Sequence, residues 1–178
     1  MGMGFWIQKK IDRIRKDAHD KNNGETHWNW QQNILDNMKK KGLIPNKSYD
    51  IFILGDNIVN YLHLPHHMKS YDDQEIYHDT YYFDNFNFEV WVENGRIETI
   101  CCDIECYWQD KNLIKMFYKE FLTLINYQQS DSDDFVYVPI SRDRGQNQRV
   151  HYFDNLGLTL WVWREKIRTI LIYNYKDE

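Results

Sequence analysis

The sequence predicts an α+β fold of two tandem modules, each a helix followed by an antiparallel meander of strands, with additional helices before them. Three observations predict this class. Residues 82–100 recur, without a gap, as residues 152–170. Within both copies apolar and polar residues alternate, which is typical of strands. Other stretches of the chain place apolar residues at helical spacing instead.

The repeat is the main organising feature of the chain. Nine of its nineteen positions are identical between the two copies. The identical pairs are Tyr82/Tyr152, Phe83/Phe153, Asp84/Asp154, Asn85/Asn155, Trp91/Trp161, Val92/Val162, Ile97/Ile167, Thr99/Thr169 and Ile100/Ile170. A duplication of this kind predicts the same supersecondary unit in both halves of the protein.

The region before the first copy is expected to begin with two helices. Apolar residues at helical spacing predict one helix over residues 5–18 and another over 27–41. The second helix ends in a run of lysines, which suits the negative end of its dipole, and Gly42 can serve as its C-cap. Residues 51–54 are then expected to form a short buried strand, and residues 56–63 a short helix.

The first copy is expected to be a meander with strands near 75–84, 86–93 and 96–106. Asn94 and Gly95 separate the last two strands, and both residues tolerate the positive φ that a two-residue hairpin turn requires. The shared Tyr-Phe-Asp-Asn is interpreted as a structural turn in which Asp and Asn bond their own backbone, in preference to a binding motif.

The second copy is expected to begin with a helix that Asp110 caps and whose apolar stripe reaches Ile125. Four strands should follow. They are predicted near 135–140, 149–154, 157–163 and 167–175. The turn of this hairpin is Arg164-Glu165, so the two copies differ in the chemistry of their tips.

Length and composition fit one compact domain with three parts. These parts are an N-terminal helical segment, 1–47, a first module, 48–106, and a second module, 107–178. The chain shows no signal peptide and no apolar run long enough to span a membrane. The three cysteines, Cys101, Cys102 and Cys106, lack zinc-site spacing and are expected to be buried thiols in a reducing cytosol. The predicted location is therefore the cytoplasm.

Charge is unevenly distributed along the chain. Residues 1–47 carry ten Lys or Arg against five Asp or Glu, whereas residues 48–178 carry twelve against twenty-two, a net charge of -10. This acidic body is unsuited to binding nucleic acid, because phosphate contacts need clustered Lys and Arg.

Two acidic segments, one before each hairpin, are predicted to border a surface that binds a basic protein. Their candidate partner-binding residues are Tyr71, Asp72, Asp73 and Glu75 in the first segment and Asp131, Asp133 and Asp134 in the second. Acidic residues interleaved with tyrosine suit such a partner. The alternative is that both segments are solvated loops, as most charge runs are.

Catalytic chemistry has little support in the sequence. His63, His66, His67 and His78 form the one cluster that could hold a metal, but Leu64-Pro65 breaks its spacing and a polar turn is the simpler interpretation. The chain contains no glycine-rich phosphate loop and no nucleophile-elbow or zinc-protease motif. The sequence therefore predicts a binding protein without a metal, a cofactor or catalytic residues.

The repeated module resembles a known class of proteins. An apolar helix opening Lys-Asn-Leu-Ile-Lys-Met, an acidic linker, Tyr-Phe-Asp-Asn and a Trp-Val strand that leads to Ile-x-Thr-Ile resemble small bacterial immunity proteins, in particular those of contact-dependent growth-inhibition systems. The resemblance covers about residues 49–175. It implies an inhibitor in the cytosol of the producing cell that blocks one cognate toxin, often a basic nuclease. It implies no catalytic residue and transfers no contact residue.

Two other classes of function stay open. The basic N-terminal region could contact phosphate in a nucleic-acid-binding or ribosome-associated module. A small hydrolase could instead use the histidine cluster or Asp72. Binding to RNA at low salt would favour the first class, and hydrolysis lost in His66→Ala or Asp72→Ala would favour the second.

Overall fold

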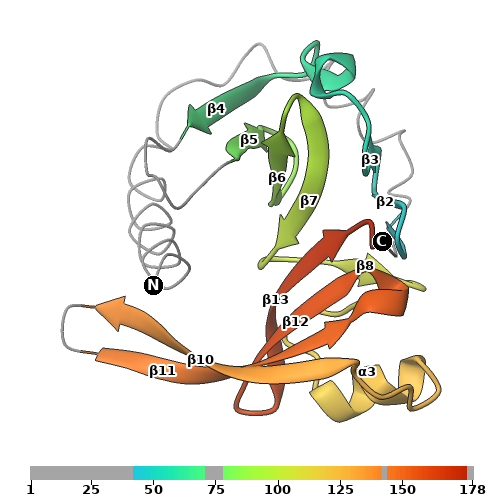
Figure 1. Cartoon of the computed structure of the whole chain (residues 1–178), viewed down its shortest axis with the longest axis vertical. Helices are drawn as coiled ribbons and strands as arrows, with labels where there is room; N and C mark the ends of the chain where they lie inside the picture. Colours follow the sequence, from blue (N-terminus) through green and yellow to red (C-terminus); the bar gives the residue numbers. More distant parts are fainter. Residues whose placement is uncertain (1–41, 71–77, 142–143, 176–178) are drawn as a thin grey trace, which may run out of the picture. The chain divides into compact units, whose positions relative to one another are not determined.

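The computed structural model describes residues 42–70, 78–141 and 144–175 (Figure 1). The helices expected over 5–18 and 27–41 lie outside these residues. By its internal contacts the chain divides into two compact units. The larger comprises Lys41–Phe135 and Gln148–Glu178, and therefore contains both copies of the repeat. The smaller comprises Met1–Lys40 and Val136–Asn147, of which the structure describes 136–141 and 144–147.

The main element is an eight-stranded sheet in the order β10-β11-β12-β13-β7-β6-β5-β4. Its strands are β4 (His66–Ser70), β5 (Asp79–Phe83), β6 (Phe88–Glu93), β7 (Arg96–Cys102), β10 (Ser132–Ser141), β11 (Arg144–Phe153), β12 (Leu158–Trp163) and β13 (Lys166–Tyr173). Every pair from β11 through to β4 is antiparallel. The expected meander of each copy is thus present, and β7 and β13 join the two meanders into one sheet (Figure 1).

Two smaller sheets precede the meanders. The first consists of β1 (Leu43–Ile44), β2 (Ser48–Tyr49) and β3 (Phe52–Ile53), and the second of β8 (Tyr107–Trp108) and β9 (Lys111–Asn112). The strand expected at 51–54 therefore exists, but as one member of a small separate sheet.

The predicted α+β class is wrong: the described residues form a mainly antiparallel β protein. Their one α-helix is α3 (Tyr118–Leu124), and the expected helix at 56–63 is the 3₁₀ turn η1 (Ile58–Tyr61). The helix expected from Asp110 begins eight residues later because β9 intervenes and because Asp110 and Lys115 adopt left-handed backbone, with φ of 62° and 69°. Apolar spacing marked Ile114 and Phe121 correctly as buried, but Phe117 of the same predicted stripe is 43% exposed, and the spacing could not reveal the residues with left-handed backbone.

The duplication is confirmed by the strand registers. In copy one Val90 pairs with Ile100, Trp91 pairs with Thr99, and the register then shifts before Val92. In copy two Leu160 pairs with Ile170, Trp161 pairs with Thr169, and the register shifts at the equivalent point, before Val162. A bulge at the same position in both hairpins is a shared structural feature.

The two copies meet symmetrically at the centre of the sheet. Strands β7 and β13 pair through Cys101 and Leu171, which occupy equivalent positions in the two copies. On either side of this pair Ile100 faces Ile172, and Cys102 faces Ile170. The pairing therefore follows a local two-fold relation between the copies.

The duplication extends into the segments before each hairpin. In the first copy Gly55 N–H donates to Ile97 C=O, Ile97 N–H donates to Asp56 C=O, and Ile58 N–H donates to Gly95 C=O. The same three bonds recur in the second copy, from Lys115 to Ile167, from Ile167 to Met116 and from Tyr118 to Glu165. η1 and α3 are thus counterparts. They lie sixty positions apart, whereas the hairpins lie seventy apart, so an ungapped comparison of the sequence misses them.

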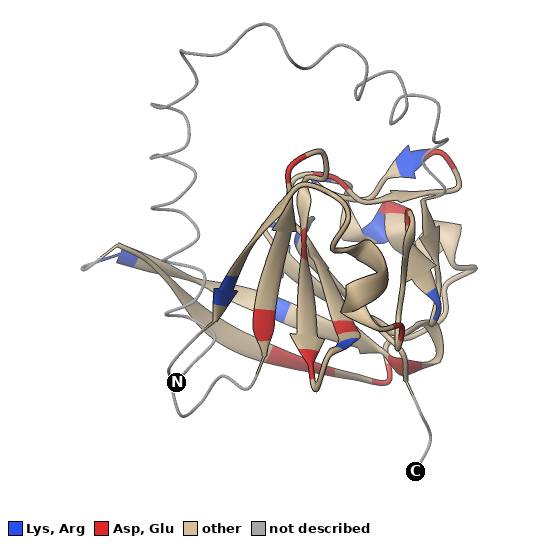
Figure 2. Ribbon diagram, turned by 90° about the horizontal axis from the view of Figure 1, so that it is seen from above, with Lys and Arg blue, Asp and Glu red and all other residues tan. Residues whose placement is uncertain are grey.

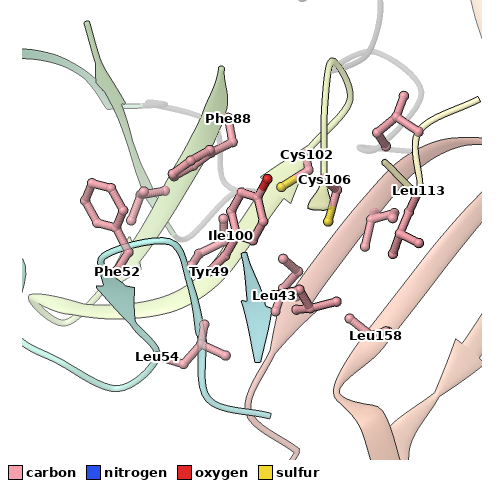
Figure 3. Packing of buried hydrophobic residues seen from close by; sticks show 14 of the residues in the cluster. Leu43, Tyr49, Phe52, Leu54, Phe88, Ile100, Cys102, Cys106, Leu113 and Leu158 are labelled. Carbon is pink, nitrogen blue, oxygen red and sulfur yellow. The ribbon is translucent and has the colours of Figure 1, made fainter. Parts of the chain in front are cut away.

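One face of the sheet packs against the small sheets and short helices to form the core (Figure 3). Buried side chains at equivalent positions of the hairpins dominate it. They are Phe88, Val90, Val92, Ile97, Ile100 and Cys102 from copy one, and Leu158, Leu160, Val162, Ile167, Ile170 and Ile172 from copy two. Cys101, Cys102 and Cys106 are buried free thiols, as predicted.

Candidate interaction surfaces

The acidity of the body belongs to one copy of the repeat. Residues 48–106 contain twelve Asp or Glu against two Lys or Arg, whereas residues 107–178 contain ten of each. The net charge of -10 therefore lies wholly in the first module. Figure 2 shows where acidic and basic residues fall on the described strands.

Three carboxylates gather at the tip of the first hairpin, and we call Asp79, Glu93 and Glu98 the acidic tip. Asp79 pairs with Val92 across β5 and β6, next to Glu93 at the end of β6. Glu93 and Glu98 are exposed, and the Asp79 carboxylate accepts a hydrogen bond of 2.7 Å from the Ser70 hydroxyl. The turn between β6 and β7 is the expected one, with φ of 50° at Asn94 and 76° at Gly95.

An imidazole and an indole adjoin the acidic tip. The His78 ring stacks on the Trp91 ring with 4.5 Å between centroids. Burial lowers the pKa of His78, although the neighbouring Asp79 and Glu93 carboxylates act in the opposite direction. His78 is therefore largely neutral at pH 7 and does not offset the charge of the acidic tip, where the nearby cation is Arg96, the cross-strand partner of Glu93.

The first predicted partner-binding segment connects β4 to β5 in the sequence. Tyr71, Asp72, Asp73 and Glu75 lie outside the described residues. The described chain stops at Ser70, the end of β4, and resumes at His78, just before β5.

The second predicted segment lies at the start of β10, and its carboxylates make bonds within the chain. Asp131 accepts from the Asp154 N–H at 2.7 Å. Asp133 forms an ion pair of 2.7 Å with Arg149, and Asp134 accepts from the Phe135 N–H. These bonds support the start of the second meander, although all three side chains stay partly exposed.

The two acidic segments do not occupy equivalent positions. Residues 71–75 follow β4, the first strand of the first meander, whereas residues 131–134 open β10, the first strand of the second. Their recurrence before each hairpin is therefore a sequence coincidence rather than part of the duplication.

Sequence reasoning missed a second surface, at the tip of the other hairpin. We call Arg164, Lys166 and Arg168, with the rings of Trp163 and Phe117, the basic tip. The guanidinium carbons of Arg164 and Arg168 lie 4.4 and 4.9 Å from the Trp163 ring centroid. Lys166 Nζ lies 4.6 Å from the Phe117 ring centroid. Contacts of this kind hold cations in place on aromatic faces.

A signal for the basic tip was present in the repeat itself. Glu93, Asn94 and Glu98 of copy one correspond to Trp163, Arg164 and Arg168 of copy two. Exchanges of charge at equivalent positions were visible once the copies had been aligned. These exchanges did not enter the sequence prediction, because most of the positions that match between the copies are apolar and indicate the fold.

The histidines expected at 63–78 are dispersed. His66 Nδ1 donates to the Leu64 carbonyl at 2.7 Å, His67 stacks on Tyr82, and His78 stacks on Trp91. Within the part of the chain that the structure describes, no three His, Cys, Asp or Glu side chains are grouped as a metal site requires.

His151 is a further buried imidazole that sequence reasoning did not select. Its ring stacks on Tyr118 at 4.1 Å, and its Nδ1 has no hydrogen-bond partner. Burial, with Arg149 nearby, lowers its pKa. The ring is a neutral packing element between β11 and α3.

Comparison with protein-family models, characterised proteins and solved structures finds no match to this chain. No helix among the described residues is long and apolar enough to cross a membrane.

Proposed function

We propose that this protein is an immunity protein that binds and neutralises a cognate antibacterial toxin, a basic nuclease, in the cytoplasm of the cell that produces both. The observation that carries the proposal is the concentration of the body's entire excess of negative charge in the first module. The resemblance of the repeated module to immunity proteins of contact-dependent growth-inhibition systems agrees with it.

The first module suits a partner that binds nucleic acid. A nuclease presents Lys and Arg around its active site to hold phosphate, and an acidic surface can occupy the same groups. Complementary charge speeds the encounter of two proteins and makes association sensitive to salt. The acidic tip, at an exposed hairpin end, is the described part of this surface.

Binding also needs contact area, because rim charges contribute more to association rate than to affinity. A standard interface buries about 800 Å² on each partner. Exposed apolar side chains of the first module can supply part of it. Val59 is 65% exposed, and Met68, on the edge strand β4, is 49% exposed. The fold does not require either of these two side chains to be exposed.

The two other classes have narrower support. A hydrolase would need its acid and base groups close together, and His66, His67 and His78 are engaged separately with a carbonyl group or aromatic rings. A nucleic-acid-binding function of the basic N-terminal region concerns residues outside those that the structure describes. Inhibition of a basic toxin would use the most asymmetric property of the chain, which is the excess of negative charge in the first module.

The test is to express the protein with the toxin domain encoded by the adjacent reading frame. We expect growth to be protected and the purified pair to associate rapidly at low salt. Glu93→Lys combined with Glu98→Lys should slow association by about tenfold and flatten its salt dependence. Reversal of Asp72 and Asp73 to Lys tests the first predicted partner-binding segment in the same assay.

The second module offers a matched control. Glu120→Lys combined with Glu165→Lys changes the net charge equally, and both side chains are exposed. This control should retain the wild-type association rate. Equal slowing by both double variants would show that only net charge matters, and absence of both complex and protection would refute the proposed function.

A further inference from the structure

We propose that the basic tip binds the phosphate backbone of single-stranded nucleic acid. This surface is distinct from the acidic tip, and the inference does not rest on the proposed function. It follows from the contacts of Trp163, Arg164, Lys166 and Arg168, from the position of the tip in the sheet, and from the contrast with copy one.

The cations of the basic tip are ordered by aromatic rings rather than neutralised by carboxylates. Within the described residues Arg164, Lys166 and Arg168 form no ion pair, although Glu165 is adjacent in sequence. The Trp163 ring holds two guanidinium groups, and the Phe117 ring holds one ammonium group. Arg164 is exposed and can offer its N–H edge to an anion, whereas Arg168 and Lys166 are partly buried and the Arg168 Nε is itself a buried atom without a hydrogen-bond partner.

Additional positive charge surrounds the tip. The backbone bonds between 115–118 and 165–167 place the start of α3 and the three residues before it along the hairpin end. Lys115 and Lys119 are exposed on this segment. The segments 115–120 and 164–168 therefore contain five Lys or Arg and two glutamates, Glu120 and Glu165, which gives them a net positive charge. A local excess of positive charge is the electrostatic signature of phosphate binding.

The acidic tip does not cancel this charge. β7 and β13 run antiparallel through the pair Cys101 and Leu171, and each begins at its own hairpin tip five residues earlier. At about 3.3 Å per residue the two tips are up to about 33 Å apart along the strands. Ionic screening acts over about 8 Å at physiological salt, so each tip acts independently.

The aromatic residues favour a nucleic acid over an acidic protein. Phe117 is 43% exposed in spite of Lys166, and Trp163 is only partly covered. Arg and Lys interleaved with partly exposed rings are a combination with which proteins hold single strands: the cations bind phosphates, and the ring surface that the cations leave open, as at Phe117, can contact a base. An acidic protein surface would use the cations but would not need the rings.

The test measures binding of fluorescein-labelled single-stranded RNA of mixed sequence by fluorescence anisotropy in about 50 mM salt. We expect the full chain to bind and Arg164→Glu to weaken binding by about tenfold or more. Lys166→Gln should lower the slope of log affinity against log salt by about one. Arg164 is exposed at a turn, so the fold should tolerate its replacement, and circular dichroism melts check this.

Lys47→Glu is the matched control, because it changes the net charge equally at an exposed position away from the tip. It should leave RNA affinity within about twofold of the wild type. Absence of RNA binding, or equal loss in Arg164→Glu and Lys47→Glu, would overturn the proposal. Competition by polyglutamate as effective as that by RNA would show an acidic protein partner and would also overturn it.

Discussion

The two hairpins of this protein share a backbone and differ in what they present to solvent. β6–β7 and β12–β13 have the same register, the same bulge and the same three bonds to the preceding segment. Yet one tip carries Glu93 and Glu98 where the other carries Trp163 and Arg168. The comparison shows that side chains facing the core retained the fold after duplication, while exposed tip positions diverged to opposite charge.

The turns make the same point about backbone and sequence. Asn94-Gly95 has the composition that a two-residue hairpin turn favours. Arg164 and Glu165 adopt the same positive φ, 48° and 61°, without a glycine or asparagine. Because non-glycine residues are disfavoured in this conformation, the strands and their bulge must impose it on the second turn.

The largest expected effect on stability concerns core residues at equivalent positions of the two hairpins. Ile100 and Ile170 are fully buried at matching positions of β7 and β13. Truncation of either to alanine should lower the free energy of unfolding by about 2–5 kcal/mol, because each leaves a cavity in the same sheet. Urea unfolding of the two alanine variants measures both free energies. We expect two costs that agree within about 1 kcal/mol, and a large cost at only one site would contradict equivalent packing.

The sequence predicted the core-facing positions of the two hairpins better than it predicted the rest of the fold. Alternation in 86–92 and 156–162 specified both hairpins and their buried faces, because one face of a sheet must exclude water. Helical spacing failed near Asp110, where left-handed residues and β9 delay the helix until Tyr118. Local apolar spacing cannot report such reversals.

Candidate surfaces were harder to predict than the fold. The acidity of the body was evident from composition, but only the comparison of modules locates it in copy one. In the sequence Asp131 and Asp133 resemble solvated charges. In the structure the Asp131 carboxylate accepts from the Asp154 N–H and Asp133 forms an ion pair with Arg149, each about twenty residues away. The basic tip requires Phe117 and Lys166 to meet across forty-nine positions, and spacing along a chain does not reveal that contact.

A second test uses a core position where the copies differ in chemistry. His151 of β11 corresponds to Tyr81 of β5, and both contact aromatic or imidazole rings. Burial lowers the pKa of His151 and raises that of Tyr81, so only the histidine can take up a proton below about pH 6.5. The folded state then binds fewer protons than the unfolded state, whose histidine has a pKa of about 6.5.

Stability should therefore be unaffected by His151 above about pH 6.5 and should fall as the pH drops from there toward the lowered pKa. The fall for one histidine is at most about 1.4 kcal/mol per pH unit. His151→Tyr, which copies the first module, should reduce the slope of unfolding free energy against pH between about 5 and 6.5. His78 also has a lowered pKa, so part of the slope should persist. An unchanged slope would mean that His151 is solvated.

The smallest expected effect concerns the tips themselves. Arg168→Ala removes a guanidinium group that lies 4.9 Å from the Trp163 ring centroid, and should lower the free energy of unfolding by about 0.5–1 kcal/mol. Glu98→Ala, at the equivalent position of copy one, removes an exposed carboxylate and should change it by less than about 0.5 kcal/mol. Urea midpoints of the two variants, measured in low and high salt, separate the contributions, because a cation held on a ring is less screened than an exposed charge. A cost above about 2 kcal/mol for Arg168→Ala would mean that the basic tip supports the fold, and its cations would then be structural rather than available to a partner.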